Sequence, residues 1–103
     1  MMKKFSILIP TYNEKKNIEL LVNKISKNLN KFTHEIIVID DNSNDGTKKI
    51  LKNINRKKNK FKYFIRANVN RDLSKSIILG IKKTIYENII IMDGDLQHNP
   101  KYL

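Results

Sequence analysis

The sequence predicts an α/β fold in which a mainly parallel sheet of about four strands is flanked by helices. Four apolar, β-branched runs alternate with three segments that carry apolar residues at helical spacing. Alternation of this kind is typical of βαβ units, whose strands are parallel and whose helices cover both faces of the sheet. With 103 residues, the chain has room for one hydrophobic core and no second domain.

The four expected strands are short apolar runs with clear boundaries, at residues 5–9, 35–39, 61–65 and 88–92. Pro10 ends the first strand, because proline lacks the N–H that a central strand donates. The second run is nearly continuous in apolar residues, so this strand is expected to be buried on both faces. His34, just before that run, is expected at the surface.

Three helices are expected in the segments between the strands. The first covers residues 17–30. The second begins near residues 45–47, with Asp45 or Ser43 as its N-cap, and the third begins after Asp72, which can also cap a helix. The side chains expected to face the core are, in chain order, Ile18, Leu21, Val22, Ile25, Leu29, Ile50, Leu51, Ile54, Leu73, Ile77, Ile78, Ile81 and Ile85.

The composition excludes several classes of protein. A net charge of +11 is common in proteins that bind nucleic acid or an anionic membrane. Here the lysines occur on every predicted helix and loop, which favours a general compositional bias over a dedicated patch, so no nucleic-acid partner is expected. Without cysteine, the chain can form neither disulfides nor a thiolate metal site. It shows no signal peptide and no apolar run long enough to span a bilayer, so we expect it to be cytoplasmic.

Carboxylates are scarce in this basic chain, yet six of the ten follow predicted strands: Glu14, Asp40, Asp41, Asp45, Asp93 and Asp95. The pattern is sharpest at Asp93-Gly94-Asp95, where a buried strand ends in two carboxylates that repel each other. A divalent cation such as Mg²⁺ or Mn²⁺ would neutralise this repulsion, since hard ions take oxygen ligands. A polar turn is the alternative interpretation, because Asp and Gly are ordinary turn formers.

Three polar segments follow the first, second and fourth strands, at residues 10–14, 40–47 and 93–98. The carboxyl ends of parallel strands meet at one edge of a sheet, where α/β proteins bind their ligands, so these segments predict one crevice. No G-x-G-x-x-G or P-loop motif and no nucleophile elbow is present. The acidic pair Asp40-Asp41 imitates a response-regulator site, but that interpretation does not explain the other two segments.

The same three segments resemble a known family. Residues 6–14 (SILIPTYNE), 35–47 (EIIVIDDNSNDGT) and 89–100 (IIIMDGDLQHNP) are similar to the nucleotide-sugar domain of family 2, GT-A fold glycosyltransferases. The most similar branch is that of the polyprenyl-phosphate sugar transferases of the dolichol-phosphate mannose synthase type. The resemblance covers essentially the whole chain and implies that residues 1–103 are the N-terminal part of a GT-A domain, truncated before the acceptor-side half. One departure is the segment at 72–76, which commonly contains glycine in the family.

The resemblance also implies a site, residue by residue. Pro10, Tyr12 and Glu14 match the segment that holds the nucleoside of the donor, and Ile39 and Asp41 match positions that contact its base and ribose. The D-x-D motif of Asp93, Gly94 and Asp95 matches the motif that binds the metal and the diphosphate, which makes the two aspartates the implied catalytic residues. Gln97 matches an additional metal ligand. The implied cofactor is Mg²⁺ or Mn²⁺.

The implied activity is transfer of a hexose, mannose or glucose, from a nucleoside-diphosphate sugar to a polyprenyl phosphate, with inversion at the anomeric carbon. GDP-mannose is the favoured donor and UDP-glucose the alternative. A lipid acceptor implies that the chain works at the membrane surface, with a membrane-bound partner subunit as a further expectation. Two other functions stay open: a non-catalytic fragment that binds a nucleotide or a partner, and a basic nucleic-acid-binding module.

Overall fold

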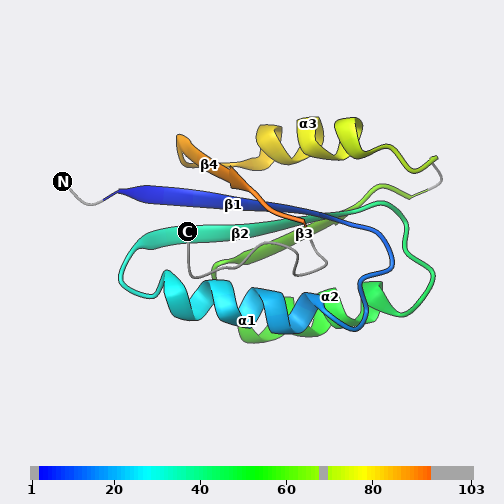
Figure 1. The fold of residues 1–103 in the computed structure, drawn as a ribbon, viewed down its shortest axis with the longest axis horizontal. Helices are drawn as coiled ribbons and strands as arrows, with labels where there is room; N and C mark the ends of the chain where they lie inside the picture. The colour runs from blue at the N-terminus through cyan, green and yellow to red at the C-terminus, as the bar shows by residue number, and fades with distance from the viewer. Residues whose placement is uncertain (1–2, 68–69, 94–103) are drawn as a thin grey trace.

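A single parallel sheet organises the computed structural model, which describes residues 3–67 and 70–93 (Figure 1). The strand order is β3-β2-β1-β4, and each neighbouring pair is parallel. The elements in chain order are β1 (Lys4–Thr11), α1 (Ile18–Asn28), β2 (Thr33–Asp40), α2 (Thr47–Lys57), β3 (Phe61–Ile65), α3 (Leu73–Lys83) and β4 (Asn88–Ile91). The predicted fold class and the alternation of strands and helices are confirmed.

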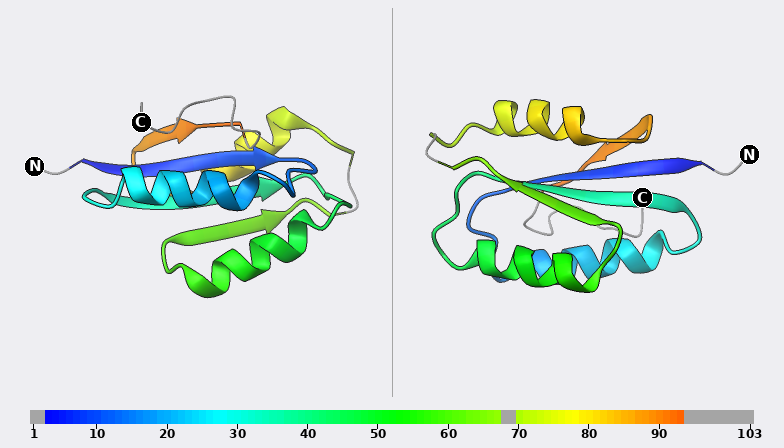
Figure 2. Two further views of the ribbon diagram at one scale, coloured as in Figure 1. Left: turned by 60° about the horizontal axis from the view of Figure 1, so that its bottom comes forward. Right: turned by 180° about the vertical axis from the view of Figure 1, so that it is seen from behind.

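Helices cover both faces of the sheet, with α1 and α2 on one face and α3 on the other (Figures 1 and 2). Successive side chains of a strand point to opposite faces, so the strands divide their apolar residues between two core clusters. Ile7, Ile9 and Val38 face α1 and α2, whereas Leu8 and Ile37 face α3. As predicted, β2 is buried on both faces.

The orientation of α3 differs from the prediction. The residues of α3 that are buried against the sheet are the small residues Ser76 and Gly80. These small residues let the helix approach β1 closely. Ile77 and Leu79 pack partly against the sheet, and the other bulky side chains of the helix turn outward. Of the residues expected in the core, Ile77 is half-buried, but Leu73, Ile78, Ile81 and Ile85 are exposed to 44–67%. The prediction was therefore wrong for these four.

The N-cap predicted for α3 is confirmed, and the N-cap predicted for α2 is wrong. Asp72 caps α3 as predicted, because its side chain accepts a hydrogen bond from the backbone N–H of Lys75 at 3.1 Å. The N-cap of α2 is Gly46, not Asp45 or Ser43. Gly46 has a φ of 102°, a left-handed conformation that favours glycine. Asp45 lies one residue before this cap, and its side chain accepts a hydrogen bond from the backbone N–H of Thr47 at 3.0 Å.

An ionic cluster around buried Glu35 lies at the end of the sheet where the strands begin. Glu35 accepts hydrogen bonds from Ser6 Oγ at 2.6 Å and from the backbone N–H of Ile85 at 2.7 Å, and it pairs with Lys62 Nζ at 2.7 Å. Burial alone would raise the pKa of Glu35, but these partners together hold it below its ordinary value. The neighbouring His34 is buried, not at the surface as expected, with its Nδ1 2.9 Å from the carbonyl oxygen of Phe32.

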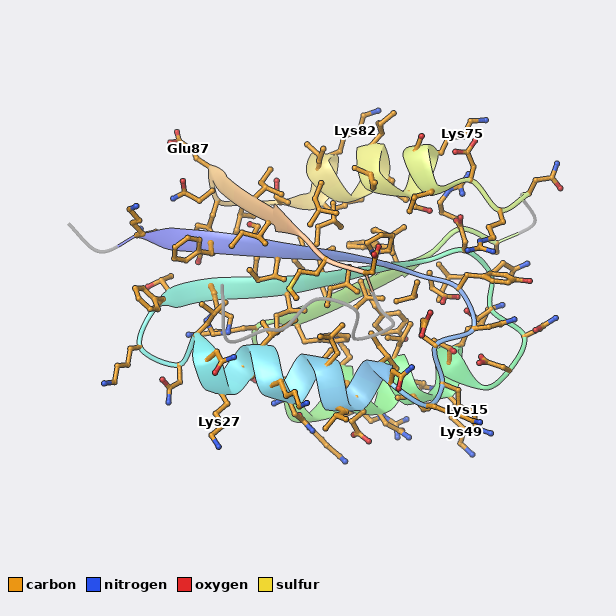
Figure 3. The ribbon with its side chains drawn as sticks, viewed as in Figure 1. Lys15, Lys27, Lys49, Lys75, Lys82 and Glu87 are labelled. Carbon is orange, nitrogen blue, oxygen red and sulfur yellow. The ribbon has the colours of Figure 1, made fainter. Side chains whose placement is uncertain are left out.

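The lysine side chains point outward on opposite sides of the molecule. In Figure 3, Lys27 of α1 and Lys49 of α2 extend from one face, and Lys75 and Lys82 of α3 extend from the other. This spread agrees with a general compositional bias. Within the described ranges, every helix is too short or too polar to cross a membrane.

Candidate functional site

A cleft of about 210 Å³ opens at the edge of the sheet where the strands end. Its walls come from the ends of β1, β2 and β4 and from the first turn of α3. The lining residues are Pro10, Thr11, Tyr12, Glu14, Asp41, Arg71, Leu73, Ser76 and Asp93. Five of them, Pro10, Tyr12, Glu14, Asp41 and Asp93, were candidates from the sequence. Residues that are up to 83 positions apart thus meet around one space, as parallel strand order predicts.

Two loops that build the cleft are tied together by Asp40, which is fully buried. Its carboxylate accepts hydrogen bonds from Thr11 Oγ1 at 2.8 Å, from the backbone N–H of Ser43 at 2.8 Å, and from Ser43 Oγ. Ser43 Oγ in turn accepts from the backbone N–H of Asn13 at 2.8 Å. Asp40 therefore orders the loop that carries Tyr12, and it does not itself line the cleft.

Asp41 reaches the cleft from the end of β2 and is only 5% exposed. Its Oδ1 accepts from Ser76 Oγ at 2.7 Å and from the guanidinium of Arg66, and its Oδ2 accepts from the backbone N–H of Asp72 at 2.8 Å. Burial would raise the pKa of Asp41, but these three donors and the positive charge of Arg66 lower it below its ordinary value. Asp41 is thus an ionised carboxylate that can only accept hydrogen bonds.

An aromatic ring and a cation lie together on another wall of the cleft. The guanidinium carbon of Arg71 lies 4.6 Å from the ring centre of Tyr12, a cation–π contact. Both side chains line the cleft, so it offers a flat apolar surface beside a positive charge. Such a pair is chemically suited to a ligand with an aromatic base and an anionic group.

The sequence did not single out Thr11, Arg71, Leu73 and Ser76 as lining residues, although Thr11 lies in the predicted segment 10–14. Ser76 falls in the segment that departs from the family pattern, and its small size is the signal that was available. Arg71 carries no comparable signal, because it lies in a loop without periodicity.

The remaining candidates are placed as follows. Ile39 is fully buried in the core cluster under α3, and its side chain does not line the cleft. Asp93 is exposed after β4 and lines the cleft. Gly94, Asp95 and Gln97 lie outside the described residues. Among the residues that are described, no group of three or more His, Asp or Glu side chains is arranged to hold a metal. The donor chemistry of Asp93, an exposed hard oxygen ligand at the cleft, suits Mg²⁺ or Mn²⁺.

Comparison with known proteins assigns the chain to a family. Residues 6–103 match the sequence profile described as Glycosyl transferase family 2. The chain belongs to glycosyltransferase family 2. It is 36% identical over 103 aligned residues to a dolichol-phosphate mannosyltransferase of Pyrococcus furiosus, an alignment that covers 97% of this chain and 28% of the relative.

Solved glycosyltransferase structures have the same fold as this family 2 chain. S. aureus TarS 1–349 in complex with UDP superposes with a TM-score of 0.77 at 29% identity, covering 89% of this chain and 27% of the other. The mannosyltransferase PcManGT of Pyrobaculum calidifontis, solved with GDP-Man and Mn²⁺, gives a TM-score of 0.77 at 21% identity, covering 92% of this chain and 28% of the other. This family 2 chain therefore spans just over a quarter of the length of these relatives.

Proposed function

We propose that residues 1–103 form the nucleotide-sugar-binding, N-terminal part of a GT-A domain that transfers a hexose to a polyprenyl phosphate. The proposal is carried by one observation: segments that follow β1, β2 and β4, each matching a family motif, line a single cleft with α3. The similarity to a dolichol-phosphate mannosyltransferase supports mannose as the sugar and a polyprenyl phosphate as the acceptor. Glucose remains the alternative.

The nucleoside of the donor is proposed to lie between the loop of Pro10, Tyr12 and Glu14 and the carboxylate of Asp41, with Ile39 supporting that carboxylate from the core. An acceptor such as Asp41 favours a base that presents a ring N–H, as guanine and uracil do. Adenine and cytosine present an unprotonated ring nitrogen in the corresponding place and are disfavoured. GDP-mannose is therefore the proposed donor, with UDP-glucose second. The solved relatives, which contain GDP-Man or UDP, agree with a guanine or uracil base.

The diphosphate is proposed to lie near Arg71 and the D-x-D motif, where Asp93, Asp95 and Gln97 would hold Mg²⁺ or Mn²⁺. When bound, the ion supplies positive charge that stabilises the departing nucleoside diphosphate. An oxygen of the acceptor phosphate forms a bond to the anomeric carbon as the bond from that carbon to the diphosphate oxygen breaks. Attack from the opposite side inverts the configuration. The acceptor phosphate is already ionised near neutral pH, so this step requires no strong general base.

A polyprenyl phosphate resides in a membrane, so the enzyme is proposed to act as a peripheral protein at the cytoplasmic membrane surface, next to a membrane-bound partner subunit. The second candidate function is a nucleotide-binding fragment without transferase activity. The chain spans 28% of its archaeal relative, so transferase activity is tested separately from nucleotide binding.

Calorimetric titration of GDP in the presence of Mn²⁺ tests donor binding. The wild-type chain should bind GDP, and Asp93→Ala/Asp95→Ala should bind at least about tenfold more weakly. Glu19→Ala/Glu87→Ala is the matched control, since both glutamates are exposed and do not line the cleft. Equal weak heats in wild type and in the Asp93/Asp95 variant would contradict the assignment. A transfer assay with GDP-mannose and a polyprenyl phosphate then separates the two candidates, because the fragment binds GDP without forming a glycolipid.

A further inference from the structure

We propose that Arg66 is a positioning residue, which fixes the carboxylate of Asp41 for the nucleoside without touching the nucleotide itself. The inference rests on the proposed function, because it assigns Arg66 a task in donor binding through Asp41. Arg66 follows β3 and is not among the residues that line the cleft. Its side chain is 11% exposed and that of Asp41 is 5% exposed, so the pair is shielded from water.

The backbone register explains why these two residues meet. In the parallel pairing of β2 and β3, Asp40 lies beside Ile65. The residues that follow the two strands, Asp41 and Arg66, therefore lie side by side. The backbone N–H of Arg66 donates to the carbonyl oxygen of Asp40 at 2.8 Å. From that position Nη1 of Arg66 donates to Oδ1 of Asp41. The salt bridge is thus a direct consequence of strand register.

Arg66 also contacts the beginning of α3, which forms part of the wall of the cleft. Its Nη1 lies 3.3 Å from the carbonyl oxygen of Asp72 and 3.5 Å from Ser76 Oγ. Ser76 and the backbone of Asp72 are the other two donors to Asp41. One guanidinium therefore joins the ends of β2 and β3 to the N-terminus of α3.

The hydrogen bonds to the carboxylate of Asp41 limit the acceptor positions that a ligand can use. An ionised carboxylate offers about four lone-pair positions. Oδ1 of Asp41 accepts from Arg66 and Ser76, and Oδ2 accepts from the backbone of Asp72. With these donors, all from the described part of the chain, one position is left on Oδ2 for a single N–H or O–H donor of a nucleoside. Arg66 determines both the direction of the carboxylate and which of its oxygens is available.

The charge of Arg66 keeps this acceptor ionised. Charged and titratable groups near Asp41 are Arg66 after β3, Asp72 at the start of α3, buried Asp40 beside it in the chain, and the cleft residues Tyr12, Glu14, Arg71 and Asp93. Without Arg66, burial and the neighbouring carboxylates would disfavour the charged form. Asp41 would then take up a proton at a higher pH, and a neutral carboxylic acid accepts the ligand's donor more weakly than a carboxylate does.

The test combines carboxyl ¹³C NMR titration of Asp41 with GDP affinity measured at several pH values. In Arg66→Gln, Asp41 should titrate at a higher pH than in the wild type. The ratio of wild-type to variant affinity for GDP should grow as the pH falls from about 7 to about 5, by up to about tenfold for each pH unit below the pKa of Asp41 in the variant. Protonation of GDP itself affects both proteins alike and cancels in this ratio. Arg56→Gln, which removes an exposed arginine of α2, should change neither quantity.

Two further variants identify the mechanism. Arg66→Lys keeps the charge but loses the planar fork, so it should bind GDP several-fold more weakly with the pH profile of the wild type. If Arg66→Gln does not fold, Arg66→Lys still tests whether the guanidinium of Arg66 contributes to GDP binding. In an Asp41→Asn background, Arg66→Gln should add no pH dependence. An unchanged Asp41 titration together with an affinity ratio that is constant with pH would overturn the assignment of Arg66. A wild-type chain that binds neither GDP nor UDP would instead overturn the proposed function.

Discussion

Gly80 of α3 lies against Leu8 of β1 so closely that a β-carbon added to it would be 2.1 Å from Leu8 Cδ1. A β-carbon fits in that space only if the buried side chain of Leu8 or the helix itself shifts. The contact fixes the height of α3 above β1 and β2, and with it the position of Ser76 beside Asp41. The same contact explains why Ile78 and Ile81 of α3 are exposed.

Gly80→Ala is expected to destabilise the fold, although alanine is the better helix former by about 1 kcal/mol. Overpacking against Leu8 should outweigh that gain and lower the free energy of unfolding by about 1–3 kcal/mol, measured by urea denaturation. Ser74→Ala, at an exposed position of the same helix, is the control and should be nearly neutral. Adding Leu8→Val should recover part of the loss, because valine lacks both clashing δ-carbons. An additive double variant would contradict the steric explanation.

Glu35→Gln should lower the free energy of unfolding at neutral pH by about 1–3 kcal/mol, because Lys62 loses its buried partner. The folded-state pKa of Glu35 is lowered from a reference value of 4.5. Its contribution is therefore complete above that value and is lost as pH falls through the folded-state pKa. The stability difference between wild type and Glu35→Gln should thus shrink below about pH 4.5 in urea titrations at each pH. A difference that is constant with pH, or an equal effect of Glu87→Gln, would argue against this role.

Asp40→Asn is expected to loosen the loop of Tyr12. An amide in place of the carboxylate loses at least one of three accepted hydrogen bonds, at a cost of about 1–3 kcal/mol. Hydrogen exchange at the backbone amide of Asn13, which donates to Ser43 Oγ, should become faster than in the wild type. Asn23→Asp, an exposed change on α1, should leave this amide unaffected. Unchanged protection of Asn13 in Asp40→Asn would show that the loop does not depend on Asp40.

Arg71→Ala should weaken GDP binding with little effect on folding, since Arg71 is exposed and its guanidinium lies over the ring of Tyr12. We expect roughly a tenfold loss of affinity in calorimetry, and a smaller loss at high salt, where electrostatic attraction to the diphosphate is screened. Thermal unfolding should be unchanged. Arg56→Ala removes the same charge from α2 and should bind GDP normally. If both variants lose affinity equally, general electrostatic attraction and not this wall of the cleft would be responsible.

Local patterns predicted the sheet well but the arrangement of α3 poorly. The β-branched run at residues 35–39 corresponds directly to β2, because a buried parallel strand requires continuous apolar residues. The orientation of α3 depends on Gly80 and Ser76, which carry no hydrophobic signal, so a pattern of isoleucines indicated the wrong face. His34 was misplaced for a related reason, because its burial depends on the packing around it and not on its own polarity.

The candidate site was predictable where it follows strand ends and not where it depends on other loops. Pro10, Tyr12, Glu14, Asp41 and Asp93 meet at the cleft because parallel strands end at one edge. Arg66 and Arg71 lie after β3, in a segment with no motif, and only the pairing of β3 with β2 brings Arg66 beside Asp41. Strand order, which the chain's local sequence does not encode, was the missing information.

The consecutive aspartates at the end of β2 have opposite surroundings, because side chains alternate along a strand. Asp40 bonds to the loops after β1 and β2, while Asp41 bonds to α3 and lines the cleft. Inserting or deleting a single residue inside β2 would exchange the two surroundings, sending each carboxylate to the wrong side of the sheet. Length variation among homologues should therefore be excluded from β2 and tolerated in the surface loops, so that an alignment gap within β2 would mark a protein that has lost this site.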